Sequence, residues 1–132
     1  MNSRPYLLAT LTILAGLANL VMAAEAHAAG DAGAGQVLYQ ARCAACHSVQ
    51  YNGVGPAHLG VFGRKAGSVD AYVYSAALSK ANLVWNEKLL DAWLRDPEKL
   101  LPGQKMGVSV ASARERADLI AYLKTLKAPP TR

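Results

Sequence analysis

A five-residue string, Cys-Ala-Ala-Cys-His, occupies positions 43–47 and decides what the rest of the chain has to accommodate. Its two cysteines are the only ones in 132 residues, so the chain cannot build a framework of several disulfides. Two thiols one helical turn apart can each form a thioether with one of the two vinyl groups at a haem edge, and the adjacent imidazole then points at the iron. The string therefore predicts one covalently attached haem c per chain, with His47 as an axial ligand.

Two other uses of this string agree less well with its surroundings. A thioredoxin-like dithiol has the same Cys-x-x-Cys spacing, but it belongs to a βαβ unit, and the sequence has no alternating strand pattern of useful length. A structural zinc site needs about four ligands. Downstream of position 28 the only cysteines and histidines are Cys43, Cys46, His47 and His58. A zinc site made of these would leave most of the chain without a role.

Residues 1–28 are expected to be an export signal and not part of the fold. A basic start precedes an uncharged run at positions 5–24, and an alanine-rich stretch follows. Cleavage is expected after Ala26 or Ala28, which leaves residues 29–132 as one domain in an oxidising compartment, the bacterial periplasm. The alternative is an uncleaved N-terminal membrane anchor, because an uncharged run of about 20 residues is nearly long enough to span a bilayer.

The remainder is expected to be all-α, with four to five helices and two long loops. Hydrophobic residues make up 52% of the chain and charged residues only 17%, which excludes a highly charged disordered protein. Asn86 and Ser112 are expected N-caps, and Asn82 is expected to end a helix in the left-handed conformation. Glycine and proline crowd residues 48–70 and 101–111, which should be irregular. The segments with a helical pattern are 33–45, 72–81, 86–96 and 112–126.

The second axial position of the iron has several candidates: Met106, His58, a lysine, solvent or an exogenous ligand. Met106 is the only methionine outside the predicted signal, and it lies in an irregular stretch instead of on an apolar helix face. We therefore expect Met106 to ligate the iron, an arrangement that raises the reduction potential and closes the metal to small ligands. If Met106 is labile or absent from the iron, the protein is instead a peroxidase or a ligand sensor.

Several further strings in the chain carry information besides the haem string. They are Gly35-x-x-x-Tyr39, Gly55–Gly67, Tyr72–Ala77, Trp85, Leu94–Pro97, Pro102–Met106 and Arg116–Leu123. Together they resemble the class I cytochromes c, small soluble electron carriers, in their bacterial periplasmic branch. The resemblance covers nearly all of residues 31–127. It implies the cytochrome c fold wrapped around one haem, and one-electron transfer between ferric and ferrous iron without enzymatic activity.

The resemblance also implies a role for each residue that matches the haem-binding positions. Cys43 and Cys46 would bind the haem vinyl groups, and His47 and Met106 would bind the iron. The Pro56 carbonyl would accept a hydrogen bond from the other ring nitrogen of His47.

Other matching residues would complete the haem environment and the helix packing. Gly35 and Tyr39 would pack against Leu119 and Tyr122 where the first and last helices cross. The family usually has leucine where this chain has His58, so a polar ring stands at a normally apolar position. The residues that would surround a haem propionate are Arg64, Tyr74 and Trp85.

The charge pattern points to redox proteins as partners. The net charge is +5 and is unchanged without residues 1–28, because Arg4 and Glu25 cancel. A positive rim would steer weak, transient contact with an acidic dehydrogenase, oxidase or membrane cytochrome complex, although the same residues could be a solvated face. A permanent cytochrome subunit of a periplasmic dehydrogenase would use the same residues. The sequence contains no basic stripe of the kind that binds nucleic acid, so nucleic-acid binding is not expected. Stable membrane insertion is not expected either once the signal has been cleaved. The expected rim consists of Arg42, Lys65, Lys80, Lys99 and Lys105.

Overall fold

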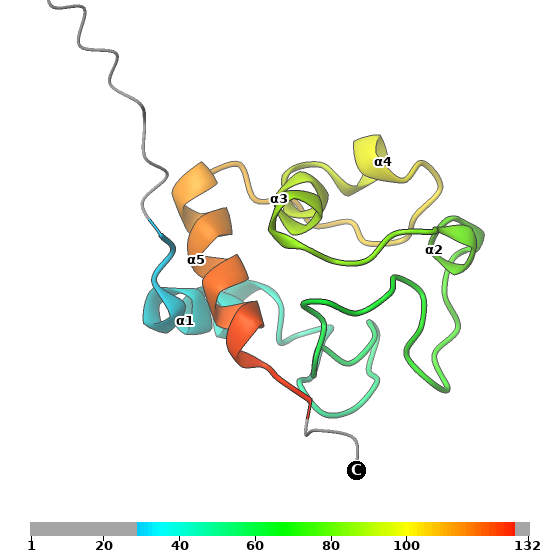
Figure 1. The fold of residues 1–132 in the computed structure, drawn as a ribbon, viewed down its shortest axis with the longest axis horizontal. Helices are drawn as coiled ribbons and strands as arrows, with labels where there is room; N and C mark the ends of the chain where they lie inside the picture. The colour runs from blue at the N-terminus through cyan, green and yellow to red at the C-terminus, as the bar shows by residue number, and fades with distance from the viewer. Residues whose placement is uncertain (1–28, 129–132) are drawn as a thin grey trace, which may run out of the picture.

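The computed structural model describes residues 29–128, so the predicted export signal at 1–28 lies outside the described residues. Five helices joined by long loops make up this part of the chain (Figure 1). They are α1 (Ala32–Arg42), α2 (Ala76–Lys80), α3 (Glu87–Arg95), α4 (Pro97–Leu100) and α5 (Ala113–Thr125). The only β-type pairing in the described range is an isolated antiparallel bridge between Lys65 and Val84. The all-α prediction is confirmed, and none of these helices is long and apolar enough to cross a membrane.

Two helices begin at the polar N-cap residues that the sequence predicted. The Asn86 side chain accepts a hydrogen bond from the Leu89 backbone N–H at 2.9 Å and begins α3. The Ser112 hydroxyl accepts from the Glu115 N–H at 3.3 Å and begins α5. Each cap satisfies a backbone donor that has no partner within its helix.

The second helix is shorter than its sequence pattern indicated. The Ser75 hydroxyl accepts a hydrogen bond from the Leu78 N–H at 3.2 Å, so α2 begins after Ser75 and Tyr72 stays outside it. The helix ends at Lys80, and its C-cap residue Ala81 is extended with φ −66°. Asn82 does not have a positive φ, so the predicted left-handed end at this residue is wrong. The apolar pattern therefore predicted a helix that starts too early, because the start of α2 is determined by the Ser75 cap and not by hydrophobic periodicity.

The short helix α4 was not predicted. Asp96 follows α3, and its carboxylate accepts a hydrogen bond from the Lys99 N–H at 3.0 Å. Pro97 occupies the first turn of α4, where the missing N–H costs nothing. The proline that ends α3 therefore also starts the next helix.

The first and last helices cross at a glycine, as expected from the sequence. Figure 1 shows α1 lying against α5. A Cβ atom at Gly35 would come 1.9 Å from the Asp118 carbonyl oxygen and 2.9 Å from Tyr122 Cβ. The rings of Tyr39 and Tyr122 pack beside this contact with centroids 5.2 Å apart. The crossing carries the α1 end that leads into the Cys-Ala-Ala-Cys-His string, so it positions the functional segment.

Replacing Gly35 by alanine should lower the free energy of unfolding by about 1–3 kcal/mol, because the new methyl group has to displace backbone of α5. The matched control is Gly33→Ala in the same helix. There the Cβ would lie 3.2 Å from the Asp31 carboxylate oxygen that accepts the N-cap hydrogen bond from the Ala34 N–H, so a side chain and not backbone has to shift by a few tenths of an ångström. That change should alter stability by less than about 1 kcal/mol, because the higher helix propensity of alanine offsets the disturbed cap. Urea unfolding of both variants checks the difference, and equal stabilities would contradict the close crossing.

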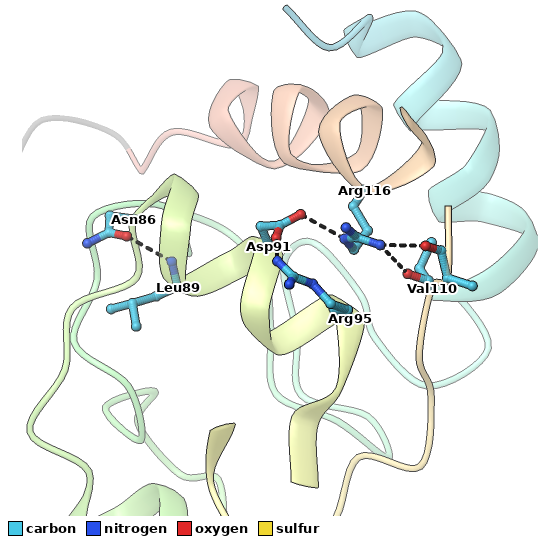
Figure 2. Close-up of polar contacts among 7 residues, drawn as sticks. Asn86, Leu89, Asp91, Arg95, Val110 and Arg116 are labelled. Atoms are coloured by element: carbon cyan, nitrogen blue, oxygen red, sulfur yellow. Dashed lines mark hydrogen bonds and ion pairs between the residues drawn. The ribbon is translucent and has the colours of Figure 1, made fainter. Parts of the chain in front are cut away.

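A buried arginine ties the loop between α4 and α5 to two helices (Figure 2). The Arg116 side chain is 6% exposed and donates to Asp91 Oδ1 of α3 at 2.7 Å. It also donates to the carbonyl oxygens of Val110 at 2.9 Å and Ala111 at 2.6 Å. The Val110 N–H donates to the Leu94 carbonyl at 2.7 Å. The C-terminal end of the Met106 loop is therefore fixed to both α3 and α5.

Candidate functional site

A cavity of about 360 Å³ opens where the loops meet helices α1, α3 and α5. Most of its surface is apolar, and the side chains that line it come from these helices, from α2 and from the loops between the helices. The sequence-predicted site residues come from distant parts of the chain, yet every one of them lines this cavity. They are Cys43, Cys46, His47, Pro56, Arg64, Tyr74, Trp85 and Met106.

The cysteines lie in a tight turn directly after α1. Cys43 is the C-cap residue of this helix, and its carbonyl accepts hydrogen bonds from the N–H groups of Cys46 at 3.1 Å and His47 at 2.9 Å. Both thiols are free, with Cys43 half-buried and Cys46 exposed. Among residues 29–128, no three His, Cys, Asp or Glu side chains converge on a common point that could hold a metal ion. Both cysteines therefore lie on the segment into which α1 leads, at the cavity wall.

The proton of His47 has a defined place on the ring. Nδ1 lies 2.8 Å from the Pro56 carbonyl oxygen, which can only accept a hydrogen bond. Nδ1 therefore carries the proton, and Nε2 keeps the lone pair that a metal needs. Burial lowers the pKa of His47, and the hydrogen bond to Pro56 opposes this only in part. A neutral ring of this tautomer leaves the Nε2 lone pair available to a metal.

A glycine gives the imidazole of His47 its space. A Cβ atom at Gly55 would lie 2.2 Å from His47 Cε1 and 2.5 Å from its Nδ1. No side chain can replace the hydrogen at this position without moving the ring. Gly55 therefore contributes to the site because its missing side chain leaves room for the His47 ring.

His58 packs against His47 in the same part of the cavity. The two rings are stacked, with centroids 4.0 Å apart and planes 18° from parallel. Nδ1 of His58 and the hydroxyl of Tyr39 share a hydrogen bond of 3.1 Å. Burial, together with smaller effects of the neighbouring His47 ring and the Arg64 cation, lowers the pKa of His58 to about 3. His58 is therefore uncharged at neutral pH.

Met106 lies in a loop that is also held at its start. The Glu98 carboxylate accepts hydrogen bonds from the Gly103 N–H at 2.9 Å and from the Gln104 side-chain amide at 3.2 Å. The Gln104 side-chain oxygen accepts from the Met106 N–H. Met106 is half-buried and packs against the hydrophobic core at the cavity wall. The loop thus presents a thioether to the cavity from a backbone fixed on both sides.

Arg64, Tyr74 and Trp85 all line the cavity, and Arg64 also holds a neighbouring turn. Its guanidinium donates to the carbonyl oxygens of Leu59 at 2.6 Å and Ala57 at 2.9 Å, which fixes the turn that carries His58. Burial lowers the pKa of Arg64 and raises the pKa of Tyr74.

Trp85 is 7% exposed and packs on the ring of Trp93, with centroids 5.4 Å apart. The indole therefore forms a rigid part of the cavity wall. Together with the cation and phenol beside it, it suits a carboxylate-bearing group next to an apolar ring.

The residues present agree with a haem in chemistry as well as in position. Apolar walls suit a flat macrocycle, and a cation with a phenol suits its propionates. Two thiols suit its vinyl groups, and an imidazole nitrogen and a thioether sulfur suit its iron.

Sequence reasoning missed the residues that fix the Met106 loop, Arg116 and Glu98. Arg116 was part of a string that resembles the family but had no assigned role, and Glu98 was visible only as a charged residue near a loop end. What separates Arg116 from most surface charges is its burial, which the sequence does not show.

Comparison with known proteins decides the family. A protein-family model described as cytochrome c matches residues 32–127. This chain belongs to the cytochrome c family. The cytochrome is 44% identical over 101 residues to cytochrome c of Euglena viridis, covering 74% of this chain and 99% of that protein. It is 41% identical over 112 residues to cytochrome c2 of Rhodomicrobium vannielii, covering 82% of this chain and 89% of that protein.

A solved structure gives the same result for the fold. Cytochrome cH from Methylobacterium extorquens matches the cytochrome with a TM-score of 0.70 and 46% identity, over 73% of this chain and 99% of that one. The predicted fold is therefore confirmed, and so is the expected function. The protein is an electron carrier with a covalently attached haem c, and the Cys-Ala-Ala-Cys-His string provides the attachment motif. Its partners are redox proteins.

Proposed function

We propose that Cys43 and Cys46 hold the haem covalently and that His47 and Met106 are its two axial ligands. The observation that carries this proposal is that all four side chains line one cavity, although Met106 lies far from the other three in the sequence. When bound, the haem supplies an iron that alternates between the ferric and ferrous states by one electron. We further propose that the chain uses this site only to carry electrons and catalyses no reaction of its own.

The protein's contribution is a ligand set that stays the same in both redox states. Pro56 holds the His47 proton on Nδ1 and so keeps Nε2 free for the metal. Glu98 and Arg116 fix the two ends of the Met106 loop. Ligands held this firmly need little rearrangement when an electron arrives or leaves. A closed iron of this kind disfavours the peroxidase and sensor alternatives, which need Met106 to leave.

The position of His58 argues against this residue as the second ligand. His58 lies parallel to His47 with ring centroids 4.0 Å apart, so the two imidazoles pack on each other and do not face each other across a space that a cofactor could fill. The Nδ1 atom of His58 is also engaged with the Tyr39 hydroxyl. Met106 would therefore be the better second ligand.

We propose that partners dock around the cavity mouth. Lys65 and Lys105 line the cavity and are exposed. Among residues 29–128, the ion pairs formed include neither of these lysines nor Lys80 and Lys99, whereas Arg42 pairs with Glu115 at 3.0 Å. Four of the five predicted rim residues therefore keep uncompensated charges. The cavity lining also includes three exposed apolar side chains, Val54, Val73 and Val108.

Small oxidants of opposite charge test whether the predicted rim attracts acidic partners. Oxidation of the reduced protein by ferricyanide, an anion, should slow as ionic strength rises, and the double variant Lys65→Gln/Lys105→Gln should slow it by about 3- to 10-fold at low salt. Oxidation by a cationic cobalt complex should change in the opposite direction. The matched control is Lys127→Gln, because Lys127 lies outside the cavity lining. Stopped-flow rates check this, and equal salt dependence for both oxidants would contradict a positive rim.

We also propose a periplasmic location after export. The support is the predicted signal at residues 1–28, together with matches to cytochromes of bacteria. N-terminal sequencing of the protein from a periplasmic extract should begin at His27 or Ala29. An N-terminus at Met1 in the membrane fraction would favour the anchored alternative.

A redox titration tests the proposed function. The purified protein should take up and release one electron per chain reversibly, and its haem should stay with the polypeptide after extraction with acidified acetone. Haem that enters the solvent would contradict attachment through Cys43 and Cys46. An irreversible titration would contradict a simple carrier.

A further inference from the structure

His58 stands at a position that is usually leucine in the family, and its ring makes two contacts that leucine cannot make in the same way. One flat face stacks on the imidazole of His47 with planes 18° from parallel. The ring edge shares a 3.1 Å hydrogen bond with the Tyr39 hydroxyl. Tyr39 is 2% exposed and packs on Tyr122 at the crossing of α1 and α5. A chain of direct contacts therefore runs from the helix crossing to the proposed ligand.

Two close neighbours crowd the His47 ring. Gly55 approaches the ring so closely that an added Cβ would overlap Cε1, Nδ1 and Nε2. His58 lies against the ring as a stacked plane. The single hydrogen bond to Pro56 fixes one edge of the imidazole but leaves the ring able to tilt about that edge. Close neighbours that prevent this tilt determine the plane in which the imidazole lies.

We propose that His58, held by Tyr39, is a positioning residue that sets the orientation of the His47 imidazole plane. This inference rests on the proposed role of His47 as an axial ligand. The orientation matters because the plane of an axial imidazole selects which iron orbital it overlaps. That choice controls how the unpaired electron of the ferric state spreads over the haem edge, from which electrons leave. Groups around a metal-bound histidine commonly orient it in this manner.

A hydrogen-bonded histidine suits this task better than an apolar residue. Its stack with His47 provides a flat wall, and the Tyr39 hydroxyl limits rotation of that wall. Arg64 contributes from the backbone side, because its bonds to the Ala57 and Leu59 carbonyls fix the turn on either side of His58. The position of the His58 ring is therefore determined by both its side chain and its backbone.

Proton NMR of the ferric protein tests the proposal, because the shifts of the four haem methyl groups report the orientation of the axial imidazole. His58→Leu should move individual methyl resonances by several parts per million. Tyr39→Phe, which keeps both rings and removes only the hydroxyl, should move them in the same sense by less. Tyr51→Phe is the matched control, since Tyr51 is 71% exposed, and should leave the pattern unchanged.

The outcomes separate this proposal from the ligand assignment. A low-spin visible spectrum that carbon monoxide does not alter, in the wild type and the variants, would show that the ligand pair is intact. Unchanged methyl shifts in His58→Leu would then overturn the positioning role. If His58→Leu fails to retain haem, Tyr39→Phe decides, and a pattern equal to that of Tyr51→Phe would overturn the proposal. Binding of carbon monoxide to the wild type would instead count against the proposed function.

Discussion

Met106→Ala should convert the protein from a closed electron carrier into one whose ferrous iron binds carbon monoxide. The variant removes the thioether that the loop presents to the cavity, and alanine has no atom that can replace it. The reduction potential should fall by on the order of 0.1 V, a fraction of the roughly 0.8 V range over which axial ligands set haem potentials. Visible spectra with and without carbon monoxide and a redox titration measure the two effects.

Val108→Ala is the matched control for this experiment. Val108 lies in the same loop, lines the same cavity and is 42% exposed, but it offers no ligand atom. After truncation of the Val108 side chain, carbon monoxide should leave the visible spectrum unchanged. The reduction potential should stay close to that of the wild type. Equal behaviour of the two variants would show that Met106 acts as packing only.

Arg116→Leu should lower the free energy of unfolding by on the order of 3 kcal/mol. The change removes the partner of Asp91 and leaves the Val110 and Ala111 carbonyls without their donor (Figure 2). Because these bonds hold the end of the Met106 loop, the variant should also bind carbon monoxide more readily than the wild type. Denaturant unfolding and carbon monoxide titration measure the two consequences.

Arg95→Leu provides a control on the same aspartate. Arg95 also pairs with Asp91, but its side chain is 60% exposed, so the loss should stay within about 0.5 kcal/mol. The contrast depends on burial, since both arginines contact one carboxylate. Similar losses for the two variants would contradict the anchoring role of Arg116.

The pH dependence of the Asp91 contribution has a defined sign. Burial opposes ionisation of Asp91, but hydrogen bonds and charge from Arg116 and Arg95 outweigh it and hold its pKa below the ordinary value of 3.8. A depressed pKa adds stability that is fully present above the unfolded-state value and is lost as the pH falls through the folded-state value. The difference in unfolding free energy between wild type and Asp91→Asn should therefore be constant above about pH 5 and shrink below about pH 4.

Much of the site could be predicted because its chemistry depends on residue identity. The spacing of Cys43 and Cys46, the adjacent His47 and the single methionine outside the predicted signal each leave few alternatives. The structure brings these residues to one cavity. The crossing at Gly35 was also predictable, because close helix approach needs a residue without a side chain.

The remainder depends on tertiary contacts that no local pattern records. The start of α2 is decided by the hydroxyl of Ser75, and α4 depends on Asp96 capping a turn that contains Pro97. The stack between His58 and His47 joins two loop residues whose spacing has no periodic meaning. Contacts of this kind follow from the assembled fold, so the sequence could indicate His58 only as a candidate ligand and as a departure from the family pattern.

Visible spectra of the reduced wild-type protein, recorded with and without carbon monoxide, test the account most directly. The central claim is that His47 and Met106 together occupy both axial positions of the haem iron. A low-spin spectrum that carbon monoxide leaves unchanged is the predicted result. A shifted spectrum with carbon monoxide bound would contradict the claim, because it would show that Met106 is absent from the iron or readily displaced.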